Sequence, residues 1–304
     1  MAAVDAPLVA IVGPTASGKS ALALQIAEEH GGEIVSCDSL QVYRGLDIGS
    51  AKPTPDERRR VPHHLIDVRD PDEIFSAADY ARLARAALAE IRSRGRLPIV
   101  AGGTGLYLRA LVSGLFEGPS RDEALRARLE GLAERFGDAR LHRLLRRVDP
   151  EAAARIHATD RLRIVRALEV FRATGRPLSA QHREGAEPLR GYHTLVVGLS
   201  PPREELRRRI AARTRQMFER GLVEEVRGLM ERGYGPDLRP LQAIGYRQAV
   251  AVLEGRITAA AAEASVVTET MQYAKRQRTW FRHQATVSWF EEAAEARARI
   301  AAHL

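Results

Sequence analysis

Short apolar runs alternate with longer amphipathic segments along the first third of the chain. The runs 8–12 (LVAIV), 33–37 (EIVSC) and 97–101 (LPIVA) have the length and composition of buried strands. Helical spacing follows in 21–32, which ends in glycine, and precedes the third run in 76–95, where a serine cap opens the segment and a glycine closes it. This alternation predicts an α/β fold with a parallel sheet flanked by helices.

The pattern changes in the middle of the chain, where residues 120–190 show helical spacing without a convincing strand. A strand pattern returns at 192–200, a single long helix is predicted over 201–230, and further helices follow. We therefore expect an α/β core made of residues 1–118 and 191–304, interrupted by an all-helical insertion domain at 119–190.

The segment GPTASGKS, between the first strand and the first helix, fills every fixed position of the phosphate-binding P-loop pattern. In such a loop the backbone N–H groups bind phosphate oxygens, a lysine supplies a point charge, and a hydroxyl is available to Mg²⁺. The motif predicts a P-loop NTPase-like core, with Ser20 as the metal ligand and a phosphate site made by Gly13, Pro14, Thr15, Ala16, Ser17, Gly18, Lys19 and Ser20.

Two further loops leave the carboxyl ends of predicted strands, at 38–41 and 102–105, and we expect them to share one cleft with the P-loop. Asp38 is the metal-binding aspartate of a kinase-like site, the proton acceptor of a group transfer to an amine, or a helix cap. Arg213 falls on the apolar face of its helix with Leu206 and Ile210, where it either meets a ligand or extends to solvent.

The composition of the chain bears on whether its partner is a polyanion. The net charge is +8, and arginine supplies 44 of the 47 basic residues because only three lysines are present. A surplus of this size suits nucleic acid or serves solubility alone. Cys37 is the single cysteine, which excludes an internal disulfide framework, and the pair His63 and His64 fits structural roles better than metal binding.

Two absences exclude other classes of protein. The chain contains no asparagine, and therefore no Asn-Lys-x-Asp motif of a regulatory GTPase. A secretory signal and an apolar run of membrane-spanning length are also missing from the sequence, so we expect a cytoplasmic protein without a membrane segment.

Five segments, GPTASGKS, SCDSLQVYRGLDIGSAKP, VPHHLIDVRDP, GGTGLYLRALVSGL and LQAIGYRQ, occur in the order and spacing of the bacterial tRNA dimethylallyltransferases, which the chain resembles over residues 8–285. The resemblance implies that the P-loop holds dimethylallyl diphosphate with Mg²⁺, and that the five-carbon group moves to N6 of adenosine 37 in tRNA as diphosphate leaves. It further implies that Asp38 is the general base, that Thr104 contacts the same nucleotide unless it only caps a helix, and that Arg213 binds the diphosphate.

The same resemblance implies a monomer whose insertion closes around the anticodon stem-loop of tRNA. The residues expected to contact the RNA are Asp38, Ser39, Leu40, Gln41, Thr104, Asp160, Arg161, Leu162, Arg163, Ile164, Gln242, Ala243, Ile244, Gly245, Tyr246, Arg247, Lys275, Arg278 and Arg282. The last three recur at helical spacing beside Trp280 and Phe281, which suits phosphate contacts and base stacking, or a solvated helix face. A prenyltransferase acting on free adenylate, a small-molecule phosphotransferase and an RNA-binding ATPase are the competing functions.

Overall fold

The structure is a computed structural model that describes residues 5–115, 118–119, 122–184 and 187–304. It divides into two compact units, Met1–Val112 with Leu189–Leu304, and Ser113–Pro188. The second unit begins six residues earlier and ends two residues earlier than the insertion expected at 119–190. None of the helices in the described ranges is both long enough and apolar enough to span a membrane.

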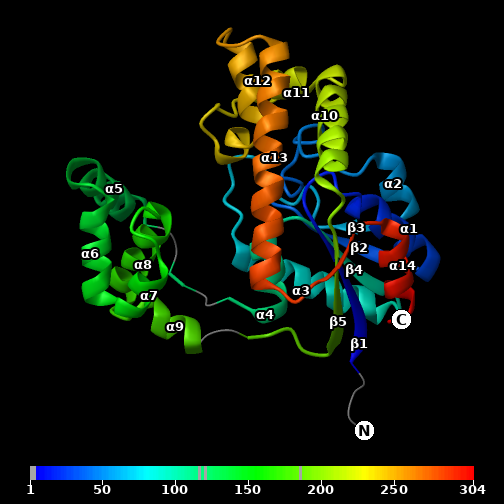
Figure 1. The fold of residues 1–304 in the computed structure, drawn as a ribbon, viewed down its shortest axis with the longest axis horizontal. Helices are drawn as coiled ribbons and strands as arrows, with labels where there is room; N and C mark the ends of the chain where they lie inside the picture. Colours follow the sequence, from blue (N-terminus) through cyan, green and yellow to red (C-terminus); the bar gives the residue numbers. More distant parts are fainter. Residues whose placement is uncertain (1–4, 116–117, 120–121, 185–186) are drawn as a thin grey trace. The chain divides into compact units, whose positions relative to one another are not determined.

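Within the described residues, the first unit is built on one parallel six-stranded sheet (Figure 1). The strand order is β3-β2-β4-β1-β5-β6. The bounds are β1 Ala6–Val12, β2 Gly32–Cys37, β3 His63–His64, β4 Leu97–Gly102, β5 Tyr192–Leu199 and β6 Ser288–Phe290. The predicted α/β fold is confirmed, although the two edge strands β3 and β6 escaped prediction because two or three residues leave no readable period.

Both faces of the sheet are covered by helices, as β1 shows. Leu8 and Ala10 face one hydrophobic cluster, whereas Val9 and Ile11 face the other, because successive side chains of a strand point to opposite faces. The helices of this unit are α1 Lys19–His30, α2 Pro55–Arg60, α3 Ala77–Ser93, α4 Gly105–Ser113, α10 Arg203–Glu219, α11 Leu222–Glu231, the 3₁₀ turn η1 Arg239–Gln242, α12 Tyr246–Leu253, α13 Ala259–Gln284 and α14 Ala293–Ala301.

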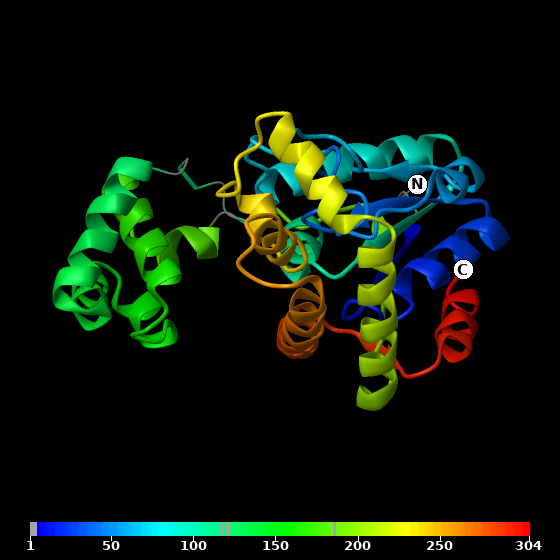
Figure 2. The same cartoon turned by 90° about the horizontal axis from the view of Figure 1, so that it is seen from above.

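The last helix, α14, closes one face of the sheet beside α1 (Figures 1 and 2). Its buried residues Ala296 and Ile300 join the cluster formed by Ile26 of α1 and Ile11 of β1. The C-terminal segment is therefore a packed helix of the core.

The single long helix predicted over 201–230 is wrong. The chain forms α10 and α11 instead, and the break falls at Gly221, whose φ of 91° belongs to the left-handed region that glycine adopts without strain. The two prolines at 201–202 precede α10 rather than occupying its first turn, since Pro202 is the cap residue.

The second unit contains helices and connecting loops but no strand in its described residues, and it has its own core. Its helices are α5 Glu123–Phe136, α6 Asp138–Val148, α7 Pro150–Arg155, α8 Arg161–Thr174 and α9 Leu178–Glu184. Leu141, Leu145 and Ile164 are fully buried at the centre of this core. Glu169 is buried with them and forms ion pairs with Arg126 at 2.9 Å and Arg166 at 2.6 Å.

Candidate active site

The P-loop connects β1 to α1, and its shape depends on glycine. A Cβ atom at Gly13 would lie 2.5 Å from the carbonyl oxygen of Leu199 and 2.9 Å from Oγ of Ser17, so no other residue fits there. The Ser17 hydroxyl is buried and has no hydrogen-bond partner within the described residues. A buried hydroxyl without a partner costs free energy, and a ligand oxygen in the loop would supply that partner.

Lys19 lies at the start of α1 with its ammonium turned back onto the loop. Its Nζ donates a hydrogen bond to the carbonyl oxygen of Pro14 at 3.3 Å. Burial and the charge of Arg213 lower the pKa of Lys19 to about 8, while the carboxylate of Asp38 acts in the opposite direction. Lys19 and Arg213 both contact the P-loop, and Asp38 lies close enough to affect the pKa of each.

Arg213 reaches the P-loop from α10. Its Nη1 donates to Oγ1 of Thr15 at 3.2 Å, and burial lowers the pKa of the guanidinium while Asp38 opposes the shift. The helical spacing put Arg213 on a face with Leu206 and Ile210, and both of these side chains are buried against Ala16 of the loop. The alternative in which Arg213 only extends to solvent is inconsistent with this contact.

Arg209 is a second contact between α10 and the P-loop, and sequence reasoning missed it. Its Nη1 donates to the carbonyl oxygen of Ser17 at 3.3 Å, while its Nε donates to Glu205 at 2.7 Å. Arg209 could not be selected from the sequence because it ends a run of three consecutive arginines. Helical spacing alone does not distinguish one of them from the others.

Asp38 follows β2, directly beside the end of β4. Its carboxylate accepts hydrogen bonds from the backbone N–H groups of Leu40 at 2.8 Å and Gln41 at 3.4 Å. Residues 38–41 therefore form a turn rather than the first turn of a helix, so the helix-cap alternative for Asp38 does not hold.

Thr104 joins the 38–41 turn to the loop after β4. Its Oγ1 accepts from the backbone N–H of Ser39 at 3.2 Å, and its own N–H donates to the carbonyl oxygen of Cys37 at 3.1 Å. The Thr104 hydroxyl thus binds the 38–41 turn at the residue next to Asp38, the candidate base. This contact holds the backbone of the two loops together.

Gln277 of α13 connects the P-loop to the loop after β4. Its Oε1 accepts from the backbone N–H of Thr15 at 3.0 Å, and its Nε2 donates to the carbonyl oxygen of Gly103 at 2.9 Å. Sequence reasoning did not select Gln277, although the signal existed: it is a polar residue at helical spacing between Ala274 and Phe281, both buried.

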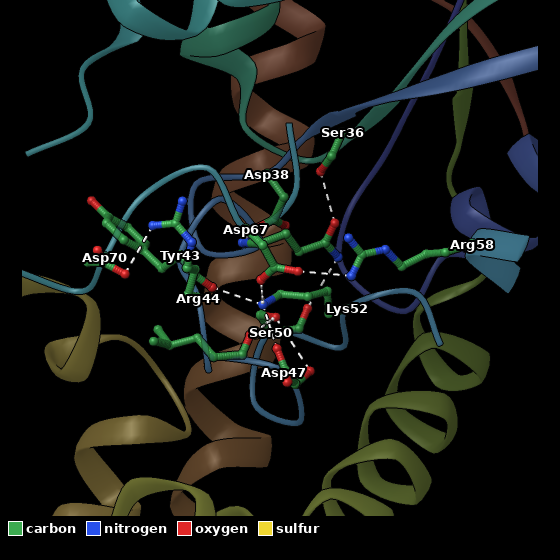
Figure 3. A network of polar contacts seen from close by, with 12 residues as sticks. Ser36, Asp38, Tyr43, Arg44, Asp47, Ser50, Lys52, Arg58, Asp67 and Asp70 are labelled. Atoms are coloured by element: carbon green, nitrogen blue, oxygen red, sulfur yellow. Dashed lines mark hydrogen bonds and ion pairs between the residues drawn. The ribbon is translucent and has the colours of Figure 1, made fainter. Parts of the chain in front are cut away.

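A polar network holds the segment that continues from Asp38 (Figure 3). Lys52, whose side chain is only 3% exposed, donates to Asp67 at 2.6 Å and to the carbonyl oxygen of Tyr43 at 2.9 Å, and it pairs with Asp47 as well. Arg58 binds the other carboxylate oxygen of Asp67 at 2.8 Å. One lysine therefore ties residues 43–52 to the segment after β3.

The same segment is anchored from its other side by α11 and α12. Glu225 accepts hydrogen bonds from the backbone N–H of Ile48 at 2.7 Å and from the hydroxyl of Tyr246 at 2.9 Å. Tyr246 is fully buried, and a Cβ atom at Gly49 would lie 2.5 Å from its ring. Tyr246 is among the residues expected to contact RNA, but its buried side chain packs against the segment that contains Ile48 and Gly49.

The other residues expected to contact RNA lie on both units. Lys275 and Arg282 are exposed on α13, Arg278 is half-buried there, and Gln242 is exposed at the end of η1. At the start of α8, Leu162 is 72% exposed, whereas Ile164 is buried. Asp160 caps this helix by accepting from the N–H of Arg163, and Arg161 donates to Asp138 at 2.6 Å.

The histidine pair has structural partners on the sheet. A ring nitrogen of His63 lies 2.8 Å from the carbonyl oxygen of Val61, and one of His64 lies 2.7 Å from the buried Glu33 carboxylate. No group of three or more His, Cys, Asp or Glu side chains suited to a metal ion occurs in the part of the chain that the structure describes. The P-loop hydroxyl of Ser20, which is exposed, stays the predicted metal ligand.

Comparisons with known proteins agree on one family. The family model IPP transferase matches residues 41–284. A tRNA dimethylallyltransferase of Solibacter usitatus is 52% identical over 94% of this chain and 93% of its own, and one of Halorhodospira halophila is 54% identical over 92% and 91%. A solved full-length tRNA isopentenylpyrophosphate transferase of Bacillus halodurans, 42% identical, has a TM-score of 0.70 and covers 97% of this chain and 96% of its own. The resemblance drawn from the five sequence segments is confirmed, and the chain belongs to the IPP transferase family.

Proposed function

We propose that the protein transfers the dimethylallyl group of dimethylallyl diphosphate to N6 of adenosine 37 in tRNA and releases diphosphate. The observation that carries the proposal is the contact of Lys19 and Arg213 with the P-loop, with Asp38 close enough to affect the pKa of both. Two cations suit a departing diphosphate, and one carboxylate suits an amine that loses a proton. The names of the relatives, tRNA dimethylallyltransferase and tRNA isopentenylpyrophosphate transferase, support this assignment.

The donor is bound by its diphosphate. The backbone of Gly13, Pro14, Thr15, Ala16, Ser17, Gly18, Lys19 and Ser20 would surround it, and the partnerless hydroxyl of Ser17 fits a phosphate oxygen. As the bond between the allylic carbon and the diphosphate oxygen breaks, negative charge grows on the leaving group. Lys19 and Arg213 stabilise this charge more in the transition state than in the bound donor.

Mg²⁺ fits the same place because it prefers few protein ligands together with phosphate oxygens. Ser20 would hold it, since the described residues offer no carboxylate cluster for an all-protein site. When bound, the ion neutralises part of the diphosphate charge. Every other contact to the leaving group comes from the chain itself.

The acceptor adenine needs a base because the lone pair of N6 is delocalised into the ring. Asp38 takes the proton of N6 as the new C–N bond forms. Its carboxylate is kept in place by two backbone N–H groups of its own turn, and Thr104 lies on the adjoining loop, where it would contact the same nucleotide. The adenine leaves its stack to reach this position.

The RNA would be bound by both units. Exposed cations of α13, residues 38–41, the turn at 242–247 and the start of α8 are the proposed contacts, with the insertion unit meeting the anticodon stem-loop. Tyr246 and Ile164 contribute through packing because their side chains are buried. The cytoplasmic location and the monomeric state expected from the sequence stay predictions.

The test is a reaction with purified protein, Mg²⁺, dimethylallyl diphosphate and unmodified tRNA that carries adenosines at positions 36–38. After digestion, the nucleosides are weighed by mass spectrometry. We expect adenosine heavier by one C5H8 unit at position 37 alone. Unchanged nucleosides from a folded, tRNA-binding protein would refute the transfer, and modification of free adenylate at an equal rate would reassign the acceptor.

A further inference from the structure

A basic cavity of about 390 Å³ lies beside the P-loop, outside the site described above. It is formed where β5 meets α10, the C-terminal half of α13 and β6. Its lining residues are Ser200, Pro201, Pro202, Arg203, Arg278, Arg282, Trp289, Phe290 and Glu291. Two of them directly follow residues that contact the loop, since Ser200 follows Leu199 and Arg278 follows Gln277.

The three arginines of the cavity have no hydrogen-bonding or ion-pair partner within the described residues. By contrast, Arg209 on α10 pairs with Glu205 at 2.7 Å. Arg278 and Arg282 lie four residues apart on α13 and thus on one helical face, and Arg203 meets them from the start of α10. Three cations that share a cavity repel one another, so an anion bound between them would be stabilised by all three.

The aromatic residues that line the cavity indicate which class of anion binds there. Trp289 is fixed by a glycine, because a Cβ atom at Gly198 would lie 2.5 Å from its ring. The face of an indole ring has no attraction for a bare phosphate or diphosphate, whereas arginines next to aromatic rings are the combination that binds single-stranded nucleic acid. Glu291 would repel a small multivalent anion but accepts hydrogen bonds from a ribose hydroxyl or a base amine.

We propose that this cavity binds one nucleotide of the RNA acceptor, with its phosphate between Arg203, Arg278 and Arg282 and its base or ribose against Trp289. The volume suits one such unit, since small-molecule sites begin near about 300 Å³. The inference rests on the proposed function, and it assigns Arg203 and Trp289 to RNA binding. It also gives Arg278 and Arg282 a shared phosphate in place of separate contacts along an exposed helix.

The experiment measures the affinity of the full-length protein for fluorescently labelled, unmodified tRNA without donor, over a range of salt concentrations. Arg203→Ala removes one cation of the cavity, and Arg207→Ala, an exposed arginine one turn along α10 outside the cavity, is the matched control. We expect Arg203→Ala to weaken binding about tenfold at low salt and to reduce the log–log salt slope by about 0.7–0.9, the value for one phosphate contact. Arg207→Ala should change neither quantity.

A second variant measures the contribution of the Trp289 ring to tRNA binding separately from that of the arginines. Trp289→Leu should weaken tRNA binding at every salt concentration and leave the salt slope unchanged, because stacking releases no counterions. Equal tRNA affinity and slope for Arg203→Ala and Arg207→Ala would overturn the proposal.

Two further outcomes would assign the cavity to another ligand. If Arg203→Ala leaves tRNA binding intact but weakens inhibition by inorganic diphosphate, the cavity serves the donor instead. If it abolishes binding of AMP while tRNA binding persists, the ligand is a free nucleotide. The nucleoside assay on the unaltered protein keeps these failures distinct from a failure of the proposed function.

Discussion

The side chain of Gln277 accepts a hydrogen bond from the backbone N–H of Thr15 at 3.0 Å across 262 residues of sequence. Its amide also donates to Gly103, so one buried side chain sets the distance between the loop for the donor and the loop that carries Thr104. The spatial relation between the two substrates therefore depends on a residue that need touch neither of them.

Replacing Gln277 by alanine removes both bonds and leaves a partly buried N–H group and a buried carbonyl group without partners. We expect a loss of about 1–3 kcal/mol in the free energy of unfolding, because unsatisfied buried polar groups cost that much. The KM for dimethylallyl diphosphate should rise as the P-loop loses its anchor. Gln272→Ala, exposed on the same helix, is the control, and equal donor KM values for the two variants would contradict the anchoring role.

The pKa of Lys19, about 8 in the folded protein, predicts an alkaline limit to donor use. Lysine is charged below its pKa, so kcat/KM for dimethylallyl diphosphate should fall as pH rises through about 8. In Lys19→Arg the fall in kcat/KM should occur at higher pH, because a guanidinium stays protonated there. This shift is expected whatever the overall rate of the variant. An alkaline limb at the same pH in both proteins would assign the titration to another group.

Asp38→Asn keeps the shape of the side chain and removes the proton acceptor. We expect turnover to fall by about 10²–10⁴, the range of general base catalysis, with tRNA affinity within twofold of the parent. Single-turnover rates at saturating RNA measure the chemical step directly. Asp72→Asn, at an exposed position, should react at the parental rate, and near-parental turnover of Asp38→Asn would exclude Asp38 as the base.

Lys52 should stabilise the segment after Asp38 through Asp67. Lys52→Met leaves the Asp67 carboxylate with fewer partners, so the melting temperature should fall. Adding Asp67→Asn to this variant should then cost less than Asp67→Asn costs in the parent, because the two residues act as a pair. A double-mutant cycle on thermal unfolding measures the coupling, and additive effects would show that the 2.6 Å contact contributes nothing.

Glu169 makes the insertion unit sensitive to acid. Burial alone raises the pKa of Glu169, but hydrogen bonds from Arg126 and Arg166 outweigh it and lower the pKa to about 2. A depressed carboxyl pKa stabilises the fold above the unfolded value of about 4.5 and loses that contribution as pH falls toward about 2. Glu169→Gln should therefore destabilise the protein strongly at pH 6 and much less at pH 3, as followed by helical circular dichroism.

Much of the core and of the candidate site was predictable because these features are local in sequence. The P-loop, Asp38 and Thr104 each follow a strand directly, and the parallel sheet brings such positions to one edge. The break at Gly221 was readable as well, since a glycine interrupts the helical pattern there, but the flanking amphipathic segments outweighed it.

The contacts that join the loops were not predictable in the same way. Gln277, Arg209 and Glu225 act through partners far away in sequence, and their residue types are ordinary on helices. Only the packing of α10, α11 and α13 against the sheet edge gives these side chains their positions. A polar residue within a buried helical stripe, as at Gln277, is the one signal that pattern alone offered.

The chain leaves and re-enters the core at adjacent points, where the N–H of Leu189 donates to the carbonyl oxygen of Val112 at 2.9 Å. To the core, the whole insertion is a loop whose ends are already held together, so lengthening it adds little closure entropy. The helices that would recognise an acceptor can thus be exchanged, shortened or rebuilt while the donor loops keep their geometry. Such an enzyme is open to redesign for other RNAs by grafting at a single attachment point.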